Sequence, residues 1–125
     1  MLYIRSIYII IMISNQLYSG SLKTIVLKLL KEEGPMHGYA ITNKVEELTK
    51  GKITLAYGAL YPILHKLESE KVLVTTSEVF NNRVRIYYAL TPSGQAVVAE
   101  KIEELKEFIE SLQLIIEPKA GLSHA

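Results

Sequence analysis

The chain has 125 residues, 49% of them hydrophobic, no cysteine and a formal net charge of +1. This length and composition predict one hydrophobic core and exclude an intrinsically disordered protein, while the lack of cysteine excludes disulfides and thiolate metal sites and favours the cytoplasm. Charge is unevenly spread, because residues 1–99 carry 11 Lys and Arg against 7 Asp and Glu, whereas residues 100–125 carry 3 against 6. Any surface for an anionic partner is therefore expected in the first part.

The chain begins with an apolar extension, residues 1–20, of which the first thirteen are mostly Ile, Tyr, Met and Leu. This run is shorter than the roughly 20 apolar residues that a membrane helix needs, and it contains Arg5. No small-residue cleavage site of a signal peptide follows it. We therefore expect no stable membrane insertion and interpret the run as an accessory helix or a strand. Translation that starts at Met12 is an open alternative.

Two amphipathic helices are predicted next from apolar residues at helical spacing. The first begins at Ser21, a plausible N-cap, and ends at Gly34-Pro35, a helix-stop signal. The second covers residues 39–49, and its apolar face is formed by Ile41, Val45 and Leu48. Tyr39 at its start is expected to pack rather than to make a contact with a partner. The residues Lys50-Gly51-Lys52 end it.

A third helix is predicted from about Thr54 to Glu70. Its apolar face is formed by Leu60, Ile63, Leu64 and Leu67. Pro62 lies inside this segment, and proline is tolerated in the first turn of a helix but costs about 3 kcal/mol in its interior. Either the helix starts close before Pro62 or it is kinked there, and the sequence leaves both open.

The apolar period then changes from that of a helix to that of a strand. Residues 72–80 are rich in Val and Thr, and residues 83–90 alternate strictly, with Arg83 and Arg85 on one face. Asn81-Asn82 separates the two runs, and asparagine tolerates the positive φ of tight hairpins. The pattern predicts a two-stranded ribbon with two arginines near its tip.

A final helix, residues 92–117, is predicted from the N-cap Thr91 and from Pro92 at the first position. Its apolar residues follow at alternating spacings of four and three, which is the a/d pattern of a coiled coil. They are Val98, Ile102, Leu105, Ile109, Leu112 and Ile116. We interpret this seam as a dimerisation surface, with packing on its own domain as the alternative. Residues 118–125 form a tail.

The order of these elements predicts a mainly α protein with a small β-hairpin (α+β): a winged helix-turn-helix over residues 21–91 with a C-terminal dimerisation helix. In such folds the recognition helix lies in the major groove of double-stranded DNA and the hairpin contacts the flanking backbone. A symmetric dimer would read two half-sites about 34 Å apart, or a multiple of this, on a near-palindromic operator. The candidate DNA-binding residues are Thr54, Tyr57, Gly58, Tyr61, His65, Lys66, Asn82, Arg83 and Arg85.

The residues argue against catalysis, a metal and a cofactor. The three histidines, His37, His65 and His124, form no cluster at ligand spacing with acidic residues. No glycine-rich phosphate loop or nucleophile elbow is present in the sequence. A competing hypothesis remains, because the net charge is small and the first residues are apolar. It is a winged-helix module that binds a protein or a membrane surface without specific DNA binding.

Several segments together resemble the PadR family of transcriptional regulators. They are His37-Gly38-Tyr39-Ala40-Ile41, Gly58-Ala59-Leu60-Tyr61-Pro62-Ile63-Leu64, and Arg83-Val84-Arg85-Ile86-Tyr87-Tyr88-Ala89-Leu90-Thr91. The resemblance covers roughly residues 21–112 and is closest to the shorter subfamily with a single C-terminal helix. It implies a cytoplasmic homodimeric repressor that is released from DNA by a cellular signal or a small molecule. An apolar cavity between the long helices of the dimer could hold a lipophilic or aromatic effector. One departure is Lys71, where the family usually has a glycine that ends the recognition helix. The expected cost of a left-handed Lys is roughly 1 kcal/mol.

Overall fold

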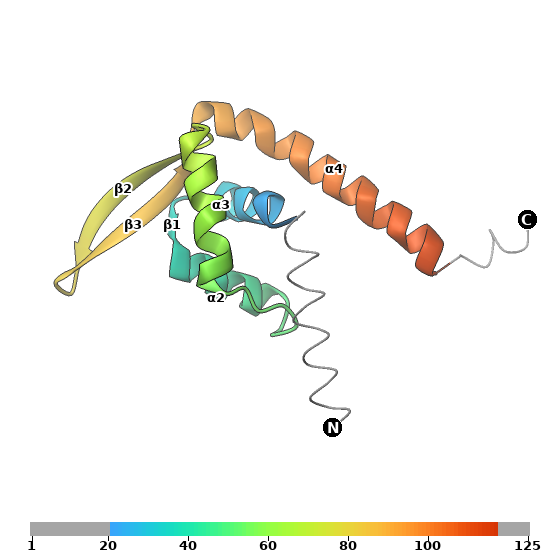
Figure 1. Ribbon diagram of the computed structural model, residues 1–125, viewed down its shortest axis with the longest axis horizontal. Helices are drawn as coiled ribbons and strands as arrows, with labels where there is room; N and C mark the ends of the chain where they lie inside the picture. The colour runs from blue at the N-terminus through green and yellow to red at the C-terminus, as the bar shows by residue number, and fades with distance from the viewer. Residues whose placement is uncertain (1–20, 118–125) are drawn as a thin grey trace, which may run out of the picture.

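The computed structural model describes residues 21–117; the predicted N-terminal extension (1–20) and tail (118–125) lie outside them. A helix over residues 21–33 is followed by the remaining elements in chain order, shown in Figure 1. These are β1 (Met36–His37), α2 (Gly38–Leu48), α3 (Tyr57–Ser69), β2 (Leu73–Phe80), β3 (Arg83–Leu90) and α4 (Pro92–Ile116). This order of helices, hairpin and long helix confirms the predicted α+β class and its winged-helix arrangement.

The helix ends follow local signals in the sequence. Gly34, at φ +80°, ends the first helix as predicted. The recognition helix α3 begins at Tyr57, later than the predicted Thr54. Thr49 Oγ1 accepts a hydrogen bond from the Ile53 N–H (3.0 Å), and the Leu55 side chain is buried in the core, so this segment stays outside the helix.

Leu48 and Pro62 are two helix residues whose positions the sequence did not settle. Leu48 was predicted to lie on the buried face of α2 but is 61% exposed. The reason is that α2 packs on the core through residues up to Val45, and Leu48 lies in the last turn beyond that contact. Pro62 lies in the second turn of α3 with an exposed ring, five residues after the helix begins.

The sheet of the described chain has three strands, not the predicted two. Their order is β1-β3-β2, and all neighbours are antiparallel. The short β1 pairs His37 with Tyr87 on β3, and two residues are too few to show a period in the sequence. The hairpin itself has the predicted form, because Phe80 pairs with Arg83 and both turn asparagines have positive φ, 50° and 61°.

Lys71 adopts the left-handed conformation, at φ +62°, so α3 ends as it would with glycine. The Val72 N–H donates to the Leu67 carbonyl (2.9 Å), which closes the end of the helix. The same turn is tied to the start of α4, since Thr91 Oγ1 donates to the Lys71 carbonyl (2.7 Å) and accepts from the Gly94 N–H (3.0 Å). The recognition helix, the hairpin and α4 therefore share one junction.

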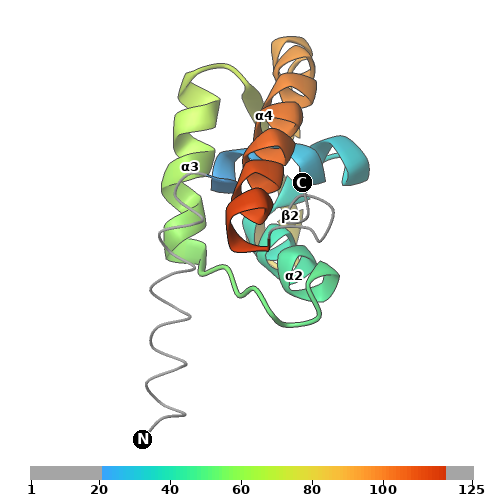
Figure 2. The same ribbon diagram turned by 90° about the vertical axis from the view of Figure 1, so that its right-hand side faces the viewer.

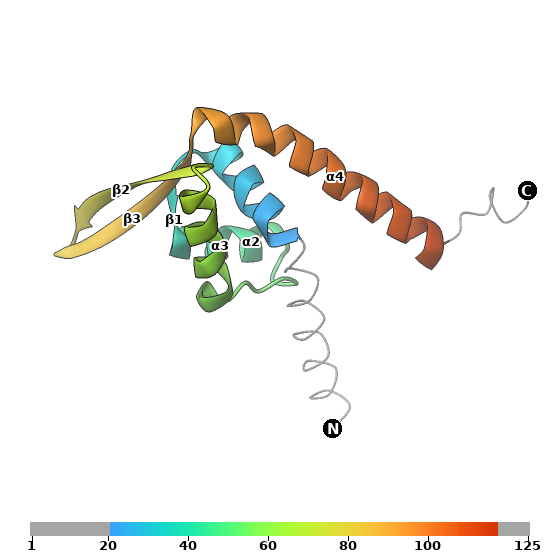
Figure 3. The same cartoon turned by 45° about the horizontal axis from the view of Figure 1, so that its top comes forward.

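The core lies between the helix of residues 21–33, α2, α3 and the base of the sheet. Its fully buried residues include Leu27, Ile41, Leu60, Leu64 and Val98. The burial of Val98 differs from its predicted place in the dimerisation seam, because the first turns of α4 close this core. The rest of α4 extends away from the domain on the side opposite to the hairpin, as Figures 1 and 3 show, and it lies in front of the domain when viewed from that side (Figure 2).

Candidate nucleic-acid interface

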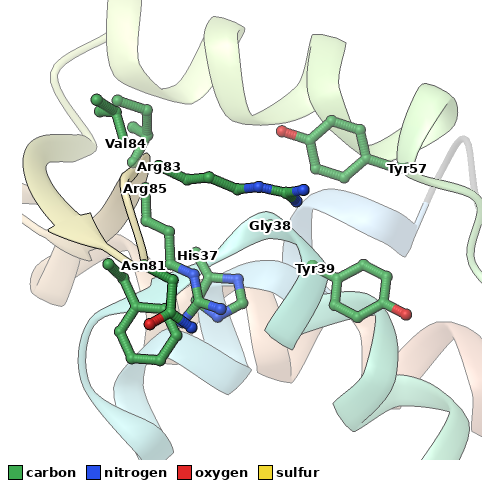
Figure 4. A pocket seen from close by; sticks show the side chains of 10 residues that line it. His37, Gly38, Tyr39, Tyr57, Asn81, Arg83, Val84 and Arg85 are labelled. Atoms are coloured by element: carbon green, nitrogen blue, oxygen red, sulfur yellow. The ribbon is translucent and has the colours of Figure 1, made fainter.

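An open cavity of about 850 Å³ lies between the hairpin and the beginnings of α2 and α3. Figure 4 shows the side chains around it. Its lining residues include His37, Gly38 and Tyr39 from the start of α2, Tyr57 from α3, and Phe80, Asn81, Arg83, Val84, Arg85 and Ile86 from the hairpin. Tertiary folding therefore brings Tyr57, Arg83 and Arg85 together, three of the predicted DNA-binding residues.

The N-terminus of the recognition helix presents free backbone donors. Ala56 is its N-cap and offers no side-chain acceptor, and the first turn has no acidic residue. The Ala59 and Leu60 N–H groups donate to the Ala56 carbonyl, whereas the Tyr57 and Gly58 N–H groups donate no hydrogen bond within residues 21–117. Free N–H groups and the positive end of a helix dipole favour an anion such as phosphate.

The two hairpin arginines carry charge that no carboxylate neutralises in the described part of the chain. Glu78 lies directly across from Arg85 in the strand register, yet the Arg85 guanidinium lies 4.1 Å from the centre of the Phe80 ring instead. A guanidinium held in this way keeps its hydrogen-bond donors available for a partner.

Unpaired cations gather on the helix-turn-helix and the hairpin. The lysines that form ion pairs are Lys23, Lys28, Lys44, Lys101 and Lys106. Within residues 21–117 the cations without such a partner are Lys31, Lys50, Lys52, Lys66, Lys71, Arg83 and Arg85. All but Lys31 lie between α2 and the end of the hairpin. Such a distribution favours a polyanion despite the small net charge.

The exposed side of α3 carries a row of aromatic rings at one-turn spacing. The ring centres of Tyr57 and Tyr61 are 5.7 Å apart, and those of Tyr61 and His65 are 4.2 Å apart. Gly58 and Lys66, also predicted as contacts, are exposed on the same helix, whereas Thr54 is exposed in the preceding loop. Mutual packing restricts the rotamers of these rings, so the helix presents a shaped surface.

Gly38 is required for the position of Tyr57. A Cβ at Gly38 would overlap the Tyr57 ring, which lies against the start of α2. A Cβ at Gly58 would meet nothing within 4 Å. The two glycines of the motifs therefore have different roles: Gly38 makes room within the protein, and Gly58 leaves the outer surface of α3 open.

Seven of the ten lining residues were not among the predicted contacts, and Tyr39, Phe80 and His37 are the ring-bearing ones. Tyr39, expected to pack, is 67% exposed, and Phe80 supports Arg85. His37 lies on the cavity wall, where burial and, to a lesser degree, the charge of Arg85 lower its pKa below 6.5. His37 and Tyr39 could have been identified from their position at the start of a helix, where N–H groups are free.

Among residues 21–117 there is no group of three or more His, Cys, Asp and Glu side chains that could hold a metal ion. No helix of that part of the chain is sufficiently long and apolar to cross a membrane.

Known proteins resemble this chain in sequence. Residues 26–100 match the family described as "Transcriptional regulator PadR-like family". The transcriptional regulator Rv3488 of Mycobacterium tuberculosis is 35% identical over 75 residues, which cover 60% of this chain and 67% of that protein.

Solved structures share the fold. A transcriptional regulator from Clostridium thermocellum has a TM-score of 0.74 at 24% identity and covers 82% of this chain and 99% of its own. Bacillus subtilis PadR in complex with operator DNA has a TM-score of 0.59 at 27% identity and covers 65% of this chain and 46% of its own. With the family match extending over more than half of the sequence, the chain belongs to the PadR-like family of DNA-binding transcriptional regulators.

Proposed function

We propose that this protein is a cytoplasmic homodimeric repressor that binds a near-palindromic operator through the face around the cavity. The observation that carries the proposal is the pair of un-neutralised arginines, Arg83 and Arg85, beside the free N–H groups at the start of α3. Phosphate oxygens satisfy both kinds of donor.

In this arrangement α3 lies in the major groove. The exposed Tyr57, Gly58, Tyr61 and His65 face the base edges, and Lys66 contacts a phosphate. The hairpin tip, with Asn82, Arg83 and Arg85, lies on the backbone beside it. Lys50 and Lys52, in the exposed loop before α3, extend the phosphate contacts on the other side of that helix.

The distal half of α4 supports the homodimer. Its apolar side chains are exposed or half-exposed in the single chain: Leu105, Phe108, Ile109, Leu112, Ile115 and Ile116. Phe108 and Ile115 lie beside the predicted a/d seam and widen it. Water-exposed apolar surface of this kind is typical of an interface, and a second copy of α4 offers a matching stripe. A lipophilic or aromatic effector would bind between the two helices and change their spacing.

The test is DNA binding measured by fluorescence anisotropy on labelled DNA from the protein's own upstream region. The titration is run over a series of salt concentrations with unrelated DNA as competitor. We expect competitor-resistant binding that weakens steeply with salt, because each neutralised phosphate releases counterions.

The matched variants are R83A/R85A and K106A. The double variant should weaken binding to all sequences. It should also reduce the slope of log affinity against log salt concentration by about two, because two phosphate contacts are lost. Lys106 lies on α4, away from the cavity, and should leave both quantities unchanged. Equal binding by wild type and R83A/R85A would remove the hairpin from the proposal. No binding even at low salt would contradict the proposal and favour a protein- or membrane-binding module, which sedimentation with anionic liposomes would detect.

A further inference from the structure

We propose that His37 is a DNA-contacting residue whose neutral imidazole donates its Nε2–H to the same backbone phosphate that Arg85 binds. This inference rests on the proposed DNA-binding face and adds a contact that carries no charge. It is carried by the hydrogen bonding of the imidazole and by its place beside Arg85.

The hydrogen bond at the start of α2 determines where the imidazole proton lies. His37 Nδ1 accepts a hydrogen bond from the Ala40 N–H at 3.2 Å. A ring nitrogen accepts only when it carries no proton, so the neutral ring carries its proton on Nε2. Nε2 is therefore a donor, and it makes no hydrogen bond within residues 21–117.

The sheet holds this donor on the cavity wall. His37 pairs with Tyr87 across β1 and β3, and the two rings meet edge to face with their centres 5.4 Å apart. Arg85 is two residues before Tyr87, on the same face of β3, and both His37 and Arg85 line the cavity (Figure 4). An anion held by the guanidinium is thus within reach of the His37 ring.

The charge state suits a shared phosphate. Burial and the neighbouring Arg85 both lower the pKa of His37, so the ring is neutral at physiological pH and does not repel the guanidinium. Among residues 21–117 no acidic side chain lines the cavity, and the other polar lining groups from this range are Arg83, Asn81, Tyr39 and Tyr57. A neutral donor strengthens phosphate binding without displacing a counterion.

Two substitutions separate the capping role from the contact. His37→Asn places an amide oxygen where Nδ1 accepts and leaves no donor at the position of Nε2. His37→Gln places an amide nitrogen near the position of Nε2 but loses the cap. Affinity is measured by anisotropy over a salt series, and stability is measured by thermal unfolding.

We expect H37N to unfold near the wild-type temperature but to bind DNA about tenfold more weakly, the effect of one hydrogen bond to a charged acceptor, with an unchanged salt slope. H37Q should unfold at a lower temperature and bind closer to wild type. R85A, as the reference, should flatten the slope. Wild-type binding by H37N would show that His37 is only a helix cap, and a flatter slope for H37N would show a charged contact; either overturns the inference. If R85A leaves the slope unchanged, the proposed DNA-binding face itself fails, whatever His37 does.

Discussion

The lack of a side chain at Gly38 in α2 makes room for the Tyr57 ring of α3. The Tyr57 ring occupies the space of a Cβ, so Gly38→Ala must displace the first aromatic ring of α3. Because Tyr57 is 46% exposed, its ring can turn aside, so we expect the free energy of unfolding to change by no more than about 1 kcal/mol while DNA affinity falls. Urea unfolding and anisotropy measure the two effects. An unchanged affinity would show that the orientation of Tyr57 does not matter for binding.

Gly58, in α3, provides the contrasting case to Gly38 in α2. Nothing lies within 4 Å of an added Cβ, and alanine is the better helix former, so Gly58→Ala should raise the free energy of unfolding by up to about 1 kcal/mol. The same variant should bind DNA more weakly, because the added methyl group keeps the backbone away from the groove. A variant that is more stable and binds equally well would place Gly58 outside the interface.

His37 also predicts a pH dependence of stability. Its pKa in the folded protein lies below 6.5, so the unfolded chain takes up the proton more readily. The stability that the neutral, capping imidazole contributes is therefore present above pH 6.5 and is lost as the pH falls through the folded-state pKa. Urea unfolding on both sides of this pH should show a smaller decrease for H37N than for wild type. Equal decreases would assign the pH dependence to other groups.

Among the elements, the end of α3 contains a local strain. Lys71 is held at φ +62° because the Val72 N–H must reach the Leu67 carbonyl and Thr91 must reach the Lys71 carbonyl. Lys71→Gly should raise the free energy of unfolding by about 1 kcal/mol, as a Cβ is unfavourable in the left-handed region. Lys71→Ala removes the same charge but keeps the Cβ, so it should give no gain. A gain for both variants would assign the effect to charge.

Considered as a whole, the molecule has its hairpin and the distal half of α4 at opposite ends (Figure 1). Leu105→Glu with Ile109→Glu should yield monomers in analytical ultracentrifugation, because a dimer would bury unpaired carboxylates. The domain should stay folded, since Val98 and Ile102 still attach α4 to the core. Ser111→Glu adds a charge on another side of α4 and should leave the dimer intact. A dimer that persists in the double variant would place the interface elsewhere.

Much of this fold follows from local spacing. The helical period of residues 22–30, the alternation of residues 83–90 and the asparagine turn between the strands predicted their elements and the face that Arg83 and Arg85 share. Periodicity succeeds here because the geometry of one helix or strand determines which of its side chains lie on one face. The candidate site was predicted in part, for the residues of α3 and the hairpin.

The sequence by itself thus determined the order of the helices and the hairpin, the turn chemistry and the family. Only the tertiary structure decided which apolar residues are covered, so Val98 is in the core while Leu48 is exposed. It also decided that β1 joins the sheet, which places His37 beside Tyr87 and Arg85, and that Arg85 lies on Phe80 rather than on Glu78. The physical reason is that some of these contacts join residues far apart in the chain, and in others one side chain has two partners of similar strength to choose from. The local period of a sequence specifies neither kind of contact.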